Sequence, residues 1–553
     1  MVSTLGNAAV GADRAPGLFA KERTLATAGY NRWLVPPAAL CTDLCIGMAY
    51  GFSVFWLPLS KALAGPVPDF CAQVSLWQEL FTTTCNWRVS SLTVTFELFI
   101  AVLGISAAVF GGWLERAGPR KSGAIAACCW GGGLLLGALG VHMHQLWLIW
   151  LGCGVIGGIG QGLGYITPVS TLIRWFPDRR GMATGLAIMG YGGGAMIGAP
   201  LAVMLMQHFR GSTTVGAWQT LAVLGVVYFI VMMAGAFLYR VAPPGYAPAG
   251  WTAPPPDRRS ALISANHVAL DRSLRTPQFW LIWFVLFFNV TAGIGVIAMA
   301  SPMLQEVFAG TLLGITAAFD ALDTHQKLQI AAIAGGFTGL LSLFNILGRF
   351  SWATVSDHLG RKPTYHVFFV LGIILYGAMP SLGAAGAVAL FVLAVGVIVS
   401  MYGGGFSTLP AYLADMFGTQ FVGAIHGRLL TAWSAAGIVG PLLISKLREA
   451  QLAAGVSRAD AYNETLYILC GLLAAGLVCN ALIRPVAQEH HMSAADLADA
   501  RASAHEAHAV PGGAAVVADA GSHGLGAVLV WLAVGIPLLW GVWITLQKAS
   551  ALF

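Results

Sequence analysis

The sequence is poor in charge, and this scarcity excludes most soluble folds. Only 9% of the 553 residues are Asp, Glu, Lys or Arg, whereas a soluble domain carries about 25%. No stretch fits the GxxxxGK[ST] pattern, which excludes ATP hydrolysis at a loop of that type. No nucleophile–base pair and no tight spacing of metal ligands stands out, which disfavours an enzyme, a metal site and a bound cofactor. Cysteine is also scarce, and its odd total of nine excludes a full disulfide framework.

Long hydrophobic runs fill most of the chain. Apolar residues make up 57% of it, and the mean hydropathy is +0.75. A bilayer core of roughly 30 Å takes about 20 apolar residues in a helix. Runs of that size recur and are continuous rather than alternating, which favours helices over a barrel. The sequence predicts an all-α polytopic membrane protein with helices near 33–60, 91–113, 122–141, 146–172, 182–206, 216–240, 277–300, 329–355, 364–381, 387–412, 423–447, 465–484 and 525–547.

Lysine and arginine are distributed unevenly between alternate loops. With the N-terminus inside, 19 of the 29 fall in cytoplasmic segments and eight in external ones, the bias that orients multi-pass proteins. The net charge of +6 is therefore a membrane signature, and the short, scattered basic loops do not support a nucleic-acid partner. The first apolar run is too long and lies too far along the chain for a signal peptide. We expect a bacterial-type inner-membrane protein with a cytoplasmic N-terminus and an external C-terminus; the oligomeric state is left open.

Two motifs recur at one sequence offset. GGWLERAGPRKSG and ATVSDHLGRKPT place Glu115 and Asp357 at matching positions, 242 residues apart. GLAIMGYGGGAMIGAP, from Gly185, and GRLLTAWSAAGIVGP, from Gly427, repeat that offset. Two motifs with one offset indicate two homologous six-helix halves with a substrate site at their interface. The predicted organisation is a cytoplasmic tail 1–32, a half 33–240, a linker 241–276, a half 277–484, a disordered cytoplasmic segment 485–523 and a last helix 524–553.

These motifs carry a family resemblance. The two acidic–basic–Gly–basic loops resemble the signature loops of the major facilitator superfamily. RWFPDRRGMATG (from Arg174), NILGR (from Asn345) and DMFGTQFVGAIHGRLLTAWSAAGIVGP (from Asp415) resemble its oxalate/formate antiporter family. The resemblance covers about residues 33–484. It implies two major-facilitator-like six-helix bundles, to which the last predicted helix is an addition, and transport of small carboxylate anions across the lipid bilayer by alternating access.

The signature loops are candidate cytoplasmic latches. An acid at a helix end can pair with arginines and with the N-terminus of a neighbouring helix, where partial positive charge accumulates. Such a contact would hold one conformation and break in the other, whereas ordinary charged turns would only fix orientation. The first loop departs from the superfamily pattern, with Glu115 in place of the usual Asp. The predicted conformational residues are Glu115, Arg116, Arg120, Asp357, Arg361 and Lys362.

Arg349 is a cation within the apolar 329–355 helix. A charge inside the membrane costs from a few to more than about ten kcal/mol, so it normally faces a wet cavity or a partner. The matching residue of the first half is Ala107, so the repeat does not require the arginine. Asn345 lies one turn earlier on the same face. The guanidinium fork suits a carboxylate, and the resemblance implies that Arg349 binds that of the substrate. The alternative is an arginine that snorkels to cytoplasmic phosphates.

The resemblance also implies a second cation, because the family's oxalate exchanger has a lysine in the helix equivalent to 423–447. Here that position holds Trp433, and its counterpart in the first half is Tyr191. These two and other aromatic residues are expected to line a cavity for a small anion, although helix packing explains each of them taken singly. The predicted substrate-binding residues are Arg349, Asn345, Tyr50, Tyr165, Tyr191, Tyr402, Phe406 and Trp433.

Two acids interrupt apolar runs. Intramembrane acids are candidates for carrying protons or for pairing with Arg349. Asp43 is the better candidate for proton coupling, because Glu97 lies near the outer end of its helix. At the inner end of the 423–447 helix, His426 and Arg428 fit gating contacts and a solvated face equally well.

Two external loops are longer than usual for the superfamily. Cys71 and Cys85 share the loop 61–90, and we predict a disulfide between them in an oxidising exterior. The loop at about 301–328 is also enlarged, so the two could form a small cap.

The sequence therefore predicts a secondary transporter of small carboxylates. Oxalate/formate-type exchange is preferred by resemblance. A proton-coupled transporter of lactate, pyruvate or formate is the alternative, favoured by Trp433 and Asp43. A membrane carboxylate sensor built on a transporter fold is the rival of another class; the low-complexity segment 485–523 offers it no signalling domain.

Overall fold

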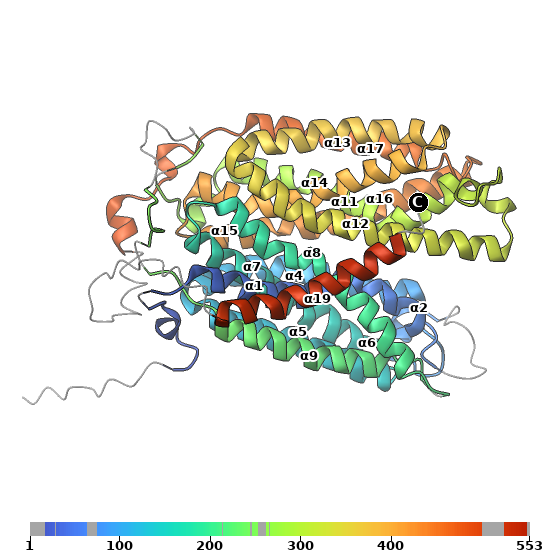
Figure 1. Ribbon diagram of the computed structural model, residues 1–553, viewed down its shortest axis with the longest axis horizontal. Coiled ribbons are helices and arrows are strands. Elements are labelled where there is room, and N and C mark those ends of the chain that lie inside the picture. The colour runs from blue at the N-terminus through green and yellow to red at the C-terminus, as the bar shows by residue number, and fades with distance from the viewer. Residues whose placement is uncertain are drawn as a thin grey trace, which may run out of the picture.

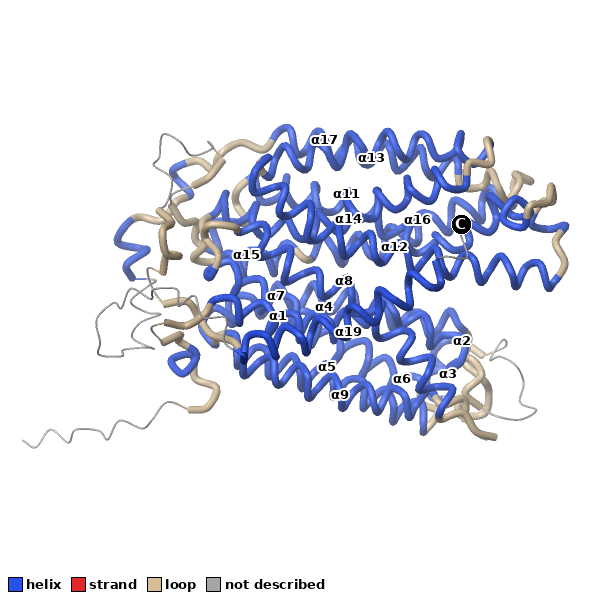
Figure 2. The backbone as a smooth tube through the Cα atoms, viewed as in Figure 1, coloured by secondary structure: helices blue, strands red, loops and turns tan. Residues whose placement is uncertain are grey.

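The computed structural model of the chain describes residues 17–27, 29–63, 74–212, 214–243, 246–252, 262–264, 266–499 and 525–549. These residues are overwhelmingly helical, and loops gather at the two ends of the helix bundle (Figure 2). Thirteen helices of the described part are long and apolar enough to cross a membrane, and each overlaps one of the predicted ranges. The predicted all-α polytopic fold is confirmed.

The first half holds six spans. Two of them are composite, because the first continues from α1 through a 3₁₀ stretch, η3, into α2, and the fourth passes from α6 through a π-helical stretch, η4, into α7. Their bounds are α1 Val35–Ile46, η3 Gly47–Phe55, α2 Trp56–Leu59, α4 Val89–Ala117, α5 Pro119–His142, α6 Leu146–Ile149, η4 Trp150–Ile156, α7 Gly157–Trp175, α8 Arg180–His208 and α9 Ala217–Leu238.

The second half holds the next six spans, and the last span follows it. The short α15 continues into α16. The bounds are α11 Pro277–Phe308, α12 Thr324–Leu359, α13 Arg361–Ala384, α14 Val388–Phe417, α15 Val422–Leu429, α16 Thr431–Ala453, α17 Asn463–Leu482 and α19 Leu525–Ala549.

The two halves lie side by side as separate helix bundles, with α1 to α9 in one and α11 to α17 in the other (Figure 1). They meet along two seams. At one seam α8 packs against α12 and α14; at the other α4 packs against α15 and α16. The same turn ends the second helix of each half, because Gly118 and Gly360 both adopt positive φ, +80° and +92°, a conformation that favours glycine. These glycines are 242 residues apart, as the repeat predicts.

The last helix, α19, crosses the α8–α12 seam (Figure 1). Near its start the Trp531 indole N–H donates to the Trp33 carbonyl of the first half, at 3.1 Å. Near its end Thr545 packs against Gly339 of α12, where an added Cβ would lie 3.3 Å away. The helix therefore contacts both halves.

The structure corrects two predictions, one about an external loop and one about a disordered segment. The enlarged external loop predicted at 301–328 is mostly helical, because α11 runs to Phe308, α12 starts at Thr324, and two short 3₁₀ stretches, Ala309–Leu313 and Phe319–Ala321, lie between them. Part of the segment predicted to be disordered packs on the linker, where the Met492 N–H donates to the His267 carbonyl at 2.9 Å. The rest of that segment, the 1–16 tail and part of the linker lie outside the described residues, so the predicted domain boundaries stay predictions.

Candidate functional site: a buried arginine between the two halves

Arg349 projects from α12 into the interface between the halves and is fully buried. Its Nε donates to the Asn345 side-chain oxygen at 2.7 Å, and its Nη1 donates to the Ile188 carbonyl of α8 at 3.3 Å. Gly192 of α8 and Gly403 of α14 make room for it, because a Cβ on either would lie 3.0–3.1 Å from the arginine side chain. Complete burial between three helices contradicts the snorkelling alternative.

Aromatic rings surround the guanidinium. Its carbon lies 5.7 Å from the centre of the Tyr191 ring and 5.4 Å from that of Phe406, distances that suit cation–π contact. Trp433 of α16 meets Phe406 at 4.8 Å and Tyr191 at 5.4 Å, both edge-on. Tyr165 of α7 packs on Tyr191 at 5.4 Å and on Trp433 at 5.2 Å. The cluster thus joins four helices from both halves.

Tyr50 and Tyr402 complete this cluster across the interface. Their hydroxyl oxygens lie 2.9 Å apart, and the two residues come from η3 of the first half and α14 of the second. The chain around Tyr50 is 3₁₀ rather than α-helical over Gly47–Phe55, a departure that often marks a functional site. All eight residues predicted to bind substrate therefore lie together. Their role in binding remains a prediction.

Four buried polar atoms of this cluster have no hydrogen-bond partner among the described residues. They are the Arg349 Nη2, the hydroxyls of Tyr165 and Tyr191, and the Trp433 Nε1. Buried polar groups are normally bonded, because leaving one unbonded costs free energy. All four can donate a hydrogen bond, and an ionised carboxylate only accepts them. A small carboxylate is therefore the kind of ligand that would satisfy this set.

The two intramembrane acids have different surroundings. Asp43 of α1 is fully buried, and neither carboxylate oxygen has a hydrogen-bond partner among the described residues. Its Cβ packs against Gly190 of α8, where an added Cβ would be 3.0 Å away. Glu97 of α4 is exposed, as its place near the outer end of that helix predicts.

His426 and Arg428 point in different directions from α15. The Arg428 guanidinium donates to the Leu270 carbonyl at 2.7 Å and to the Asp271 carboxylate at 3.4 Å, so it faces the linker and not the aromatic cluster. The His426 ring is fully buried 5.9 Å from that of Tyr165, and neither ring nitrogen has a partner in the described part of the chain.

On the predicted cytoplasmic side, Asp357 links the two halves. Its carboxylate accepts hydrogen bonds from the backbone N–H groups of Gly181 and Met182, at 2.8 and 2.9 Å, at the start of α8. A carboxylate at this place also complements the positive end of the helix. Arg361 pairs with Asp357 at 2.6 Å within the second half.

A second inter-half contact joins Arg180 of α8 to Asp415 of α14 at 2.9 Å. Asp415 also accepts from Arg361 at 3.1 Å, which connects the two contacts. The sequence analysis assigned no role to Arg180 or Asp415, although both lie in the quoted family motifs. Their repeat counterparts, Val422 and Ile173, are apolar, so repeat matching gave no signal for this pair.

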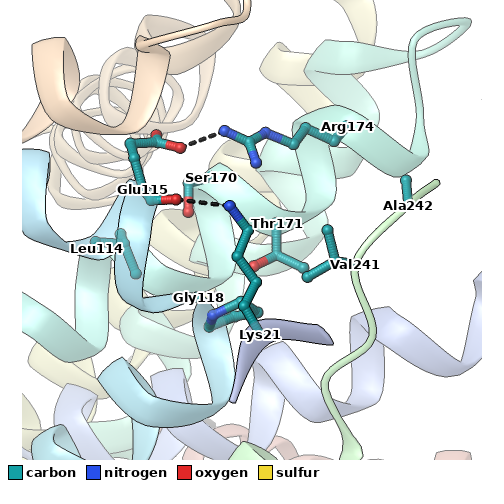
Figure 3. Close-up of a pocket in the computed structure, with 10 residues that line it drawn as sticks. Lys21, Leu114, Glu115, Gly118, Ser170, Thr171, Arg174, Val241 and Ala242 are labelled. Carbon is teal, nitrogen blue, oxygen red and sulfur yellow. Dashed lines mark hydrogen bonds and ion pairs between the residues drawn. The ribbon is translucent and has the colours of Figure 1, made fainter. Parts of the chain in front are cut away.

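Glu115, the counterpart of Asp357, has a different partner. It pairs with Arg174 of α7 in its own half, while the Lys21 ammonium donates to its backbone carbonyl at 2.8 Å (Figure 3). Its other carboxylate oxygen is buried without a partner in the described chain, beside Gly423, the residue equivalent to Gly181. Burial, together with the nearby Arg174, lowers the pKa of Lys21.

Three other predicted conformational residues lie away from the inter-half contacts. Arg116 is exposed and has no hydrogen bond or ion pair to the described residues. Arg120 donates to the carbonyls of Leu18 and Phe237, at 3.1 and 3.4 Å, within the first half. Lys362 donates to two carbonyls at the end of α17, each at 2.8 Å, within the second.

The predicted disulfide falls partly outside the described residues. Cys85 is disulfide-bonded, but Cys71 is not among the described residues, so the pairing stays a prediction. The Cys85 carbonyl lies 2.9 Å from Nε2 of His144, and burial lowers the pKa of this histidine.

Comparison with known proteins places the chain in a family. The model of the Major Facilitator Superfamily matches residues 44–441. The chain belongs to this superfamily. Solved superfamily structures share the fold of this transporter; the proton:xylose symporter XylE, for example, superposes with a TM-score of 0.55 at 15% identity, covering 84% of this chain and 98% of that one.

Relatives of this superfamily member carry several names. It is 24% identical to an uncharacterised MFS-type transporter of Escherichia coli (strain K12), over 72% of this chain and 83% of that protein. It is 28% identical to the oxalate:formate antiporter of Oxalobacter formigenes, over 52% of this chain and 59% of that protein. It is 25% identical to human monocarboxylate transporter 11, over 75% and 77% respectively.

Proposed function

We propose that this transporter carries a small carboxylate, which it binds at Arg349 and moves by alternating access. One observation carries the proposal. Arg349 is fully buried between the halves, and its Nη2 and the neighbouring hydroxyl and indole groups of Tyr165, Tyr191 and Trp433 have no hydrogen-bond partner in the described part of the chain. A carboxylate would accept from the guanidinium fork and from the neighbouring donors together.

The charge of the site favours a monocarboxylate. Arg349 is the only cation among the eight residues of the site, and Trp433 stands where the family resemblance implies a lysine. Arg428, the nearest alternative on the same span, is bonded to the linker. A dianion would leave its second carboxylate without a cation in a buried, low-dielectric place, which is costly. Formate, lactate and pyruvate each carry one carboxylate and therefore need only one cation.

Oxalate/formate exchange is the second candidate. The similarity to the oxalate:formate antiporter supports it, as do Arg349 and the family motifs around it. In this candidate, tyrosine hydroxyls and water would have to solvate the second carboxylate of oxalate. The similarity to monocarboxylate transporter 11 supports the first candidate.

The proposed transport cycle uses the contacts at the cytoplasmic side. Asp357 at the start of α8 and the Arg180–Asp415 pair hold the halves together there. Breaking these contacts would open the site to the cytoplasm, and re-forming them would close it. We propose a bacterial-type inner membrane, a cytoplasmic N-terminus and an external C-terminus, on the basis of the loop charges and an odd number of spans.

The proposal is tested with purified transporter in proteoliposomes. The lumen is loaded with formate, oxalate, lactate or buffer alone, and uptake of each labelled acid is followed. We expect uptake of at least one monocarboxylate and weaker uptake of oxalate. Uptake that requires an acid in the lumen indicates exchange. Binding of a carboxylate with no uptake under any loading would instead support the sensor.

A further inference from the structure

One pair of facing residues differs between the two seams. Where α8 meets α14, Thr184 faces Ser407; where α15 meets α7, His426 faces Tyr165. Thr184 and His426 are 242 residues apart, as are Tyr165 and Ser407, and the prolines inside α7 and α14 keep the same offset. The repeat therefore makes the two pairs equivalent, although their side chains are unlike.

The two pairs also differ in their hydrogen bonds. The Thr184 hydroxyl lies within bonding distance of three carbonyls, that of Ser407 at 2.7 Å and two of its own helix at 3.0 Å each. His426 is also fully buried, but neither ring nitrogen has a hydrogen-bond partner among the described residues, and the Tyr165 hydroxyl has none there either. Buried polar groups are normally bonded. The first pair is complete without a ligand, whereas the second leaves three polar atoms that a ligand could bond.

His426 adjoins the site around Arg349. Its ring centre lies 5.9 Å from that of Tyr165, and the Tyr165 ring lies 5.4 Å from Tyr191 and 5.2 Å from Trp433. The Tyr191 ring in turn lies 5.7 Å from the guanidinium carbon of Arg349. A ligand that carries a polar group beyond its carboxylate could therefore bond to the guanidinium and to the His426–Tyr165 pair together.

The open groups of this site differ in what they can bond. The Arg349 guanidinium only donates, which suits a carboxylate, whereas an uncharged imidazole has one donor and one acceptor nitrogen and a tyrosine hydroxyl can act in either way. A hydroxyl on the substrate pairs with either imidazole nitrogen, whichever tautomer the ring adopts. An oxo group pairs only with a donor, and a methyl group pairs with neither. A substrate hydroxyl is therefore the group that fits the pair best.

Resting on the proposed function, we propose that His426 and Tyr165 form a second subsite that binds a hydroxyl group on the carbon chain of the substrate. The preferred substrates are then short hydroxy acids such as lactate, with the carboxylate at Arg349 and the hydroxyl at His426. Formate carries no second polar group and would use the first subsite alone. His426 is in this view a residue that determines specificity, and binding changes no covalent bond of the substrate.

A matched pair of acids tests the inference on purified protein. Lactate and propionate share one carbon skeleton and differ by the hydroxyl, and the affinity of each is measured calorimetrically. We expect the wild type to bind lactate at least about tenfold more tightly, because propionate leaves buried polar groups unpaired. His426→Phe keeps a ring but removes both nitrogens, and should bring the ratio of affinities close to one, chiefly by weakening lactate. His426→Gln keeps a donor and an acceptor and should retain part of the preference.

The control and the contrary outcomes separate the inference from the proposed function. His208→Phe, at the exposed end of α8, should keep the wild-type ratio. Equal affinity of the wild type for lactate and propionate would overturn the inference and leave the proposed function standing, as would a lactate preference that survives His426→Phe. If His426→Phe does not fold, Tyr165→Phe decides, because a lowered ratio supports the subsite and an unchanged one refutes it.

Two further outcomes concern the class of substrate. Oxalate bound more tightly than lactate by the wild type, with that preference lost in His426→Phe, would assign the subsite to a second carboxylate. This result would overturn the inference in favour of the second candidate function. Failure to bind or carry any monocarboxylate would instead overturn the proposed function.

Discussion

Each half of this transporter contains a copy of the same signature loop, and the acidic residues of the two copies make different contacts. In the second half, Asp357 reaches across the interface and binds two backbone N–H groups at the start of α8. In the first half, Glu115 pairs with Arg174 of the same half, and its other carboxylate oxygen lies beside Gly423 without a hydrogen bond to any described residue. The repeat therefore conserves the place of the acid but not its partner, and the two latches are unequal in this conformation.

The interface between the halves shows a larger difference of the same kind. Position 349 is an arginine in the second half, and position 107 of the first is an alanine that is fully buried. The shared architecture thus positions the helices, and the proposed substrate binding rests on a residue that departs from the repeat.

The largest effect is expected from removing the charge of Arg349, which distinguishes the second half from the first. Arg349→Ala should abolish detectable carboxylate binding. Arg349→Lys keeps the charge but loses the fork, and should weaken binding by about 1–3 kcal/mol, the scale of a charge-assisted hydrogen bond. Affinity is measured calorimetrically with lactate and formate. Arg428→Gln removes an arginine of the linker contact and should leave affinity unchanged; normal affinity in Arg349→Ala would refute the assignment.

The next largest effect, on turnover, is expected from changing the acids of the two predicted latches, Asp357 and Glu115. Asp357→Asn loses charge-assisted hydrogen bonds worth about 1.5–3 kcal/mol each, so the predicted cytoplasmic side should open in the absence of substrate. Turnover should fall at least about tenfold, with affinity changed far less. Glu115→Gln should do less, because Glu115 makes no hydrogen bond to the described residues of the other half.

Distances between spin labels at the exposed residues Lys121 and His358, in a cysteine-free background, report this opening directly. A longer distance in Asp357→Asn and little change in Glu115→Gln is the expected pattern. Equal opening in both variants would mean that the latches are equivalent and that their different partners do not matter.

A third prediction replaces each of the two aromatic residues at matching positions, Trp433 and Tyr191, with lysine. Trp433→Lys adds a second cation from α16, and should raise the affinity for oxalate relative to lactate by about tenfold, the worth of a hydrogen bond to a charged group. Tyr191→Lys places the cation against Arg349 instead and should weaken binding of both acids. Competition between labelled lactate and unlabelled oxalate measures the ratio; no change in Trp433→Lys would remove the missing lysine as the reason for selectivity.

The smallest effect concerns the outer ends of the halves. The second half is held there by ion pairs of Glu306 with Arg448 and Arg458, whereas the first has the disulfide of Cys85. Because Glu79 and Arg88 already fix the same loop, Cys85→Ser should lower the thermal midpoint slightly and leave turnover unchanged. Mass spectrometry of unreduced wild type should find Cys85 joined to Cys71. Two free thiols would disprove the pairing.

The sequence predicted the membrane-spanning helices well, but it predicted less well which side chains pair with one another. The thirteen helices follow from hydrophobic length, and the offset of 242 residues predicts matching turns at Gly118 and Gly360. Composition does not reveal that Gly47–Phe55 winds as a 3₁₀ helix, because its apolar residues suit an α-helix equally well. Nor could spacing show that Glu115 pairs with Arg174, since the repeat fixes the position of the acid but not the half that provides its partner. The Arg180–Asp415 pair joins residues 235 positions apart. The equivalent positions of the repeat are apolar, so repeat matching could not predict this pair.

The position of α19 has a consequence for how the protein is made. Its contacts, Trp33 of the first half and Gly339 of the second, are synthesised long before it and far apart in the chain. Because a ribosome delivers residues in order, α19 enters the bilayer when both of its docking surfaces already exist. Its full docking therefore requires that the two halves have come together at the α8–α12 seam.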